Sequence, residues 1–262
     1  MDRRRFLQLA ALPLAAQQKP PVESVTATAT QDRTPRVAII LSSFRGSMEH
    51  HGTLLPGLLD PQPVTTPLSP EHLDAMLRKA IELGTTRAGG LPSIMGPEDW
   101  VVIQHDAIAD PRLIRGLKAF LEAQSLGKRF SVAGPMELDG AETQEMPVPG
   151  GERLYRIPKL LLQCDRLLRV AALLADTFRH PGTPDLAVVD RMSFHPPDYT
   201  ILAGRNILVA GADPLAVDSV GARILGLDPT NLPYLRLAAD RGLGVWEPGA
   251  IWTRGNKIEE AR

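Results

Sequence analysis

Cysteine is almost absent: the sequence has one among 262 residues. One thiol cannot form a disulfide within the chain, and a cysteine-ligated iron–sulfur cluster usually needs about four thiolates. We therefore expect no cysteine-ligated iron–sulfur cluster within this chain, and any redox chemistry would need a partner. Cys164 ends the apolar segment LLLQC, which favours a buried, inert thiol on a helix.

An excess of charge of either sign is also lacking. Lys and Arg number 29 and Asp and Glu number 30, so the formal net charge is −1. This balance predicts no nucleic-acid partner and no attraction to an anionic membrane surface. No segment after the N-terminus approaches the roughly 18 apolar residues of a membrane helix, so we expect no stable membrane span after signal removal. The length suits one large α/β domain or two small ones.

The N-terminus has the features of an export signal. Residues 1–16 hold a basic start, a short apolar stretch and small residues at its end. The letters RRxFL resemble the twin-arginine motif, although Asp2 replaces the usual Ser or Thr and Pro13 interrupts the apolar stretch. We expect a twin-arginine-like signal peptide over residues 1–16, a linker over residues 17–35, and a periplasmic or otherwise exported protein. A plain basic tail is the alternative.

Residues 36–262 alternate between strand and helix patterns. Apolar, β-branched runs predict strands, and pairs such as Asp213-Pro214 predict helix starts, with a capping side chain before a proline. The alternation predicts a single α/β domain with a mostly parallel sheet and helices on both faces. The expected strands are residues 36–41, 100–104, 129–132, 166–170, 185–189 and 206–210. The expected helices are residues 69–83, 111–125, 158–164, 171–178, 214–225 and 232–241, with a short hairpin after Gly244.

The segment over residues 203–244 carries a family resemblance. Its motif, DPLAVDSVGARILGLDP followed by LPYLRLAADRGLG, resembles the C-terminal signature of the domain of unknown function 362 family. Upstream segments keep that family's order, so the resemblance covers roughly residues 70–244. They are LDAMLRKAIELGT, PEDWVVIQ, RLIRGLKAFLEA, KRFSVAGP, YRIPKLLLQCDRLLRV and PDLAVVD. The resemblance implies a family whose biochemistry is largely unassigned and some of whose members carry iron–sulfur modules.

Three loops depart from the family's pattern. Gln104-His105-Asp106 stand where related domains typically have a Lys-Pro-Asn-like tripeptide. Residues 171–180 lack the Lys and the paired His of a Pro-x-Leu-Lys-Thr-His-like segment, and residues 193–197 replace a Glu-Gly-x-Gly-Pro-like loop. The resemblance therefore implies a member that has lost or altered the family's site.

Polar residues at the carboxyl ends of the expected strands are the candidates for function, because ligands of open parallel sheets bind there. Four of them form a His/Asp set suited to acid–base catalysis or to a divalent metal. These candidate catalytic residues are His105, Asp106, Asp190 and His195. The candidate substrate-binding residues are Ser43, Arg45 and Asp213, of which Asp213 is also explained as a helix cap. No short metal motif such as His-Glu-x-x-His occurs, so metal and cofactor stay unassigned.

Two hypotheses of function follow. In the first, the chain is an exported family member without assigned activity, an accessory or binding protein for a redox or metal-carrying partner. In the second, it is an enzyme with a His/Asp acid–base or metal site in a cleft at the strand ends. The changed loops favour the first, and the polar strand ends keep the second open. The second requires the four candidate catalytic side chains to lie within about one water-bridged contact of each other.

Overall fold

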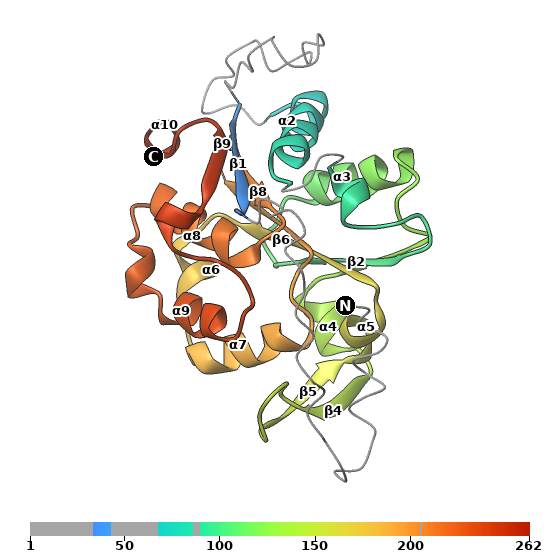
Figure 1. The fold of residues 1–262 in the computed structure, drawn as a ribbon. Coiled ribbons are helices and arrows are strands. Elements are labelled where there is room, and N and C mark those ends of the chain that lie inside the picture. Colours follow the sequence, from blue (N-terminus) through green and yellow to red (C-terminus); the bar gives the residue numbers. More distant parts are fainter. Residues whose placement is uncertain (1–33, 43–67, 86–89, 205) are drawn as a thin grey trace, which may run out of the picture. The chain divides into compact units, whose positions relative to one another are not determined.

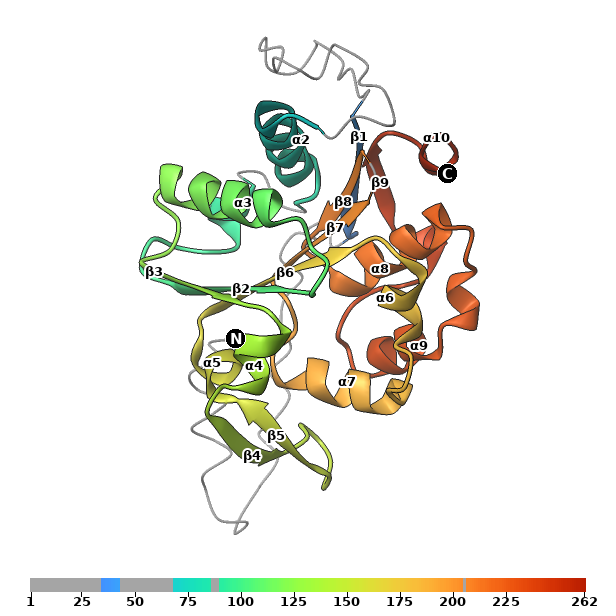
Figure 2. The ribbon, with the colours of Figure 1, turned by 180° about the vertical axis from the view of Figure 1, so that it is seen from behind.

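A computed structural model describes residues 34–42, 68–85, 90–204 and 206–262. The expected signal peptide, most of the expected linker, and the candidates Ser43 and Arg45 lie outside the described residues. Thr34–Arg262 forms one unit by its internal contacts. Within it a twisted sheet lies between two groups of helices, and a small hairpin extends from one end (Figures 1 and 2).

The larger sheet has seven strands in the order β3-β2-β6-β7-β8-β1-β9. The strands are β1 (Arg36–Leu41), β2 (Trp100–His105), β3 (Arg129–Ala133), β6 (Arg166–Ala172), β7 (Tyr199–Gly204), β8 (Ile207–Gly211) and β9 (Trp252–Gly255). Strands β3, β2, β6 and β7 are parallel, as are β1 and β9, whereas β8 is antiparallel to both of its neighbours. The predicted α/β fold with a mostly parallel sheet is confirmed.

Helices cover both faces of this sheet. Successive side chains of a strand point to opposite faces, and strands such as β1, β7 and β8 are buried along nearly their whole length, so both faces need a cover. On one face α2 (Pro70–Leu83) and α3 (Pro111–Ala123) pack on a core that includes Ile40 and Ile103. On the other face α8 (Pro214–Ile224) and α9 (Pro233–Asp240) pack on a core that includes Leu202 and Val209. The remaining helices are α4 (Pro135–Asp139), α5 (Lys159–Gln163), α6 (Ala175–Arg179), α7 (Asp185–Phe194) and α10 (Ile258–Ala261).

The long helices begin where their capping residues predict. The Ser69 hydroxyl accepts a hydrogen bond from the backbone N–H of His72 at 3.2 Å, and the Asp110 carboxylate accepts one from that of Arg112 at 2.8 Å. Each cap is followed by proline at the first helical position, where no N–H is needed. These local signals fix the starts of α2 and α3.

Two expected elements are wrong. Residues 185–189, expected as a strand, form the first half of α7, in which Val189 is buried and Asp185 supplies an acid in the first turn. The segment after Gly244 forms no hairpin of its own, because β9 pairs in parallel with β1. The strand that occupies the centre of the sheet in place of residues 185–189 is β7, which turns directly into β8 through Asn206 at φ 55°.

Candidate functional site

His105 and Asp106 lie together at the carboxyl end of β2. The Asp106 carboxylate accepts hydrogen bonds from the backbone N–H of Ala172 at 2.6 Å and of Ile108 at 3.2 Å. It thereby joins the end of β2 to the end of β6. The His105 Nδ1 lies 2.8 Å from the Asp106 carbonyl oxygen. Both carboxylate oxygens of Asp106 therefore accept hydrogen bonds from backbone N–H groups.

His195 lies towards the opposite end of the same strands. Its Nδ1 is 2.6 Å from the Leu161 carbonyl oxygen, and its Nε2 is 3.8 Å from the carboxylate of Asp198. Asp198 also accepts a hydrogen bond from the backbone N–H of Leu167, near the start of β6, whereas His105 pairs with Val170 near its end. Leu167 and Val170 are three residues apart, about 10 Å along a strand.

Cys164 lies beside His195. Its sulfur is 3.6 Å from His195 Nδ1 and 3.6 Å from the Leu161 carbonyl oxygen. The side chain is buried against Val102 and Leu167. The prediction of a buried thiol is confirmed.

Asp213 is the N-cap of α8. One carboxylate oxygen accepts hydrogen bonds from the backbone N–H groups of Leu215 and Ala216, at 3.0 and 2.9 Å. The other oxygen accepts one from Val245 at 2.9 Å, which fixes the segment after α9. Burial raises the pKa of Asp213, against the lowering effect of these three bonds. The helix-cap role is confirmed, and it uses both carboxylate oxygens.

Asp190, the remaining candidate, lies on α7 with a fully buried carboxylate between three cationic or phenolic groups. The Tyr155 hydroxyl donates to Oδ2 at 2.7 Å. The Arg153 guanidinium is 3.2 Å from Oδ2, and the Arg241 guanidinium is 2.6 Å from Oδ1. Burial raises the pKa of Asp190, but the contacts with Tyr155, Arg241 and Arg153 together outweigh it and hold that pKa below its usual value. Asp190 is therefore an anion at neutral pH.

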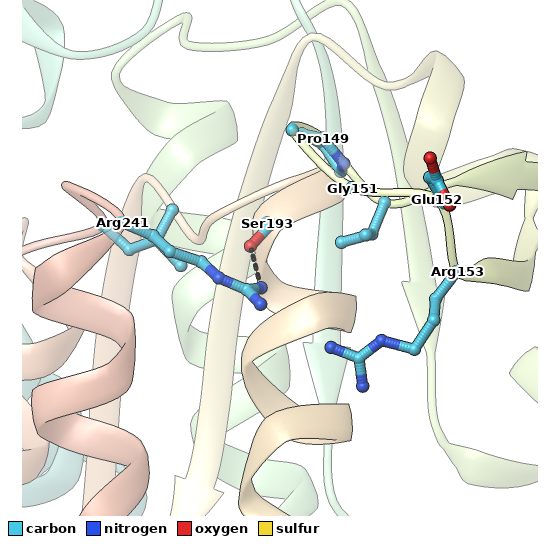
Figure 3. Close-up of a pocket in the computed structure, with 9 residues that line it drawn as sticks. Pro149, Gly151, Glu152, Arg153, Ser193 and Arg241 are labelled. Carbon is cyan, nitrogen blue, oxygen red and sulfur yellow. Dashed lines mark hydrogen bonds between the residues drawn. The ribbon is translucent and has the colours of Figure 1, made fainter.

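An open pocket of about 710 Å³ lies beside Asp190. Arg153 and Arg241 enter it from opposite sides, and Arg241 donates a hydrogen bond to the Ser193 hydroxyl at 3.2 Å (Figure 3). The lining residues are Val148, Pro149, Gly150, Gly151, Glu152, Arg153, Ser193, Arg241 and Leu243. The volume is within the range of about 300–1,000 Å³ found for small-molecule sites.

Three elements position this pocket. The hairpin of β4 (Thr143–Pro147) and β5 (Leu154–Pro158) presents its turn, which is closed by hydrogen bonds from Val148 N to Arg153 O and from Gly151 N to Val148 O. Gly150 occupies the turn at φ 77°, a conformation that favours glycine. Helix α7 presents Asp190 and Ser193, three residues apart on one face. Arg241 follows the end of α9.

Sequence reasoning missed Arg153, Tyr155 and Arg241. A signal for the turn of the hairpin was available in Gly150-Gly151, but its first strand, TQEMP, contains glutamate and proline, which are depleted in strands. The contact with Asp190 had no such signal, because the expected strand over residues 185–189 placed that side chain at the sheet edge. The four candidate catalytic residues thus lie in three different environments and do not assemble into one cleft.

A second buried polar cluster lies on the α8 face of the sheet. Arg169, within β6, places Nη1 at 3.0 and 3.1 Å from the two carboxylate oxygens of Asp218 on α8. The Tyr234 hydroxyl donates to the same carboxylate at 3.1 Å, and the His180 ring packs edge-on against the Tyr234 ring at 4.7 Å. This buried ion pair joins β6 to α8.

The burial of His180 leads us to expect a loss of stability in mild acid. Burial lowers the pKa of His180 below its usual 6.5, an effect that Asp218 opposes and Arg169 reinforces. As pH falls through 6.5, the unfolded chain takes up a proton at this residue before the folded chain does, so the folded state is destabilised. His180→Asn, which tolerates the left-handed backbone at φ 46°, should reduce this pH dependence. Denaturant unfolding at about pH 8 and about pH 5.5 measures how the free energy of unfolding changes with pH. The same change in the unsubstituted protein and in the His180→Asn variant would contradict the prediction.

The structure shows an α/β domain with an open pocket that is lined by two arginines, Arg153 and Arg241. No protein-family model matches this chain, and neither a curated protein nor a solved structure matches it. Among the described helices, none has both the length and the apolarity needed to cross a membrane. Within residues 34–42, 68–85, 90–204 and 206–262, no group of three or more His, Cys, Asp or Glu is arranged to hold a metal ion.

Proposed function

We propose that this chain is an exported binding protein of the domain of unknown function 362 family, and that its pocket beside Asp190 takes a small ligand with an oxyanion group. The pair of guanidinium groups on opposite sides of the pocket carries the proposal. The family and the export are supported by the ordered motifs over residues 70–244 and by the twin-arginine-like start.

The two arginines keep donors available for a ligand. A guanidinium has five N–H donors in a planar fork that matches a carboxylate or a phosphate. Towards Asp190, Arg153 uses Nη2 and Arg241 uses Nη1. The buried carboxylate therefore holds both cations at the pocket and leaves their other nitrogens for a bound anion.

Binding fits the chain better than catalysis by the four candidate residues. Asp106 holds two backbone N–H groups, Asp190 holds two arginines, and His195 lies towards the other end of the strands from His105. An accessory role beside a redox or metal-carrying partner stays a prediction, and the pocket would be the ligand site of such an accessory protein.

Titration calorimetry of the full chain with sodium benzoate and with inorganic phosphate tests the proposal. We expect one or both anions to bind, and Arg241→Gln to weaken binding about tenfold or more because it removes one of the two forks. Arg254→Gln is the matched control, since Arg254 stacks on Trp252 outside the pocket lining. Circular dichroism verifies that both variants fold. If neither anion binds, or if both substitutions weaken binding equally, the proposal is contradicted.

A further inference from the structure

Resting on the proposed function, we infer that the pocket selects a monocarboxylate with an apolar body over a phosphate ester. Charge is the first reason. Arg153 and Arg241 bring two positive charges, and the buried Asp190 carboxylate that contacts both brings one negative charge, so this ion-paired group of three residues carries one excess positive charge. A carboxylate carries one negative charge and balances that excess, whereas a phosphate monoester carries nearly two at neutral pH.

Two acidic groups, one buried behind the arginines and one in the pocket lining, strengthen this preference. The Asp190 side chain has 0% exposure, so water screens its charge weakly, and it lies within ion-pair distance of both arginines. Glu152 lines the pocket from the hairpin turn. A dianion held between the two guanidinium groups would be repelled by both carboxylates, and a monoanion would be repelled less.

The remaining lining residues favour a ligand that has an apolar part. Val148, Pro149 and Leu243 contribute apolar side chains to the pocket, and Val148 is almost fully buried. The planar guanidinium fork matches the flat carboxylate group, with the apolar part then directed at these side chains. A pocket of about 710 Å³ has room for a ligand well beyond the size of acetate.

Titration calorimetry with four related probes measures the selection. Benzoate has the carboxylate and an apolar body, phenyl phosphate has the same body with a dianion, benzamide is the neutral counterpart, and acetate lacks the body. We expect benzoate to bind about tenfold or more tightly than phenyl phosphate and acetate, and benzamide not to bind. Glu152→Gln should increase the affinity for phenyl phosphate more than that for benzoate. Glu145→Gln, on the same hairpin but outside the pocket lining, should leave both affinities unchanged.

The outcomes separate this inference from the proposed function. Phenyl phosphate binding as tightly as benzoate would overturn the charge selection and leave an oxyanion site in place. If benzoate binds no more tightly than acetate, the inference that the pocket prefers a ligand with an apolar body is overturned. The proposed function itself is overturned if none of the anions binds, that is, neither benzoate, phenyl phosphate, acetate nor inorganic phosphate.

Discussion

Replacing Arg169 by methionine is expected to lower the free energy of unfolding by about 3–5 kcal/mol. The Asp218 carboxylate is 1% exposed, and Arg169 is its cationic partner at 3.0 Å. Methionine fills a similar volume but leaves the carboxylate with the Tyr234 hydroxyl as its remaining side-chain donor. An unpaired buried charge costs more than the intact pair contributes, so the loss should be large. Urea unfolding followed by circular dichroism measures it.

A double substitution separates the charge effect from lost packing. Arg169→Met combined with Asp218→Asn removes both charges at nearly constant shape, so it should recover part of the stability lost by Arg169→Met alone. Lys128→Met is the surface control, because Lys128 and Glu98 form an exposed pair whose loss should not be measurable. If Arg169→Met unfolds at the same urea concentration as the Lys128 variant, the ion pair does not stabilise this fold.

The second large effect is expected at Gly84, which follows α2 and lies against β8. A Cβ at this position would come within 2.5 Å of the Ala210 carbonyl oxygen, 2.6 Å of the Tyr199 hydroxyl and 2.8 Å of the Ala80 carbonyl oxygen. Two of these atoms belong to the backbone and cannot rotate away. The substitution Gly84→Ala should therefore cost about 2–3 kcal/mol, through the displacement of α2 from the sheet.

Gly96→Ala provides the matched control for Gly84. A Cβ at Gly96 would meet no atom within 4 Å among the described residues. Both substitutions add the same methyl group and restrict the unfolded chain equally. Thermal unfolding should show a clear decrease in Tm for Gly84→Ala and little change for Gly96→Ala. Equal values of Tm would show that α2 has room to move away from β8.

The features that could be predicted from the sequence are local ones. The starts of α2, α3 and α8 follow from Ser69, Asp110 and Asp213, because a cap and a following proline lie within a few residues of the bonds that they make. Buried strands such as β2 and β8 follow from continuous apolar runs. These signals were sufficient for the α/β fold and its mostly parallel sheet.

The candidate site could not be predicted in the same way, because it depends on contacts between distant segments. Asp190 meets Tyr155 from 35 residues away, and Arg169 meets Asp218 from 49 residues away. Assigning residues 185–189 to a strand moved Asp190 to the wrong place, since a short run such as DLAVV has the composition of either element. The sequence pointed correctly to Asp190 as a polar residue of interest, and only its three partners reveal a pocket between two arginines.

The most direct measurement is an NMR titration of the full, ¹⁵N-labelled chain with benzoate, observed at the arginine Nε–H groups. Signals are assigned with the Arg153→Gln, Arg241→Gln and Arg169→Met variants. We expect the Arg153 and Arg241 signals to shift together and to saturate, while the Arg169 signal, held by Asp218, stays in place. Arg153 and Arg241 signals that do not move, or shifts of the same size at arginines throughout the protein, would contradict an anion site in this pocket.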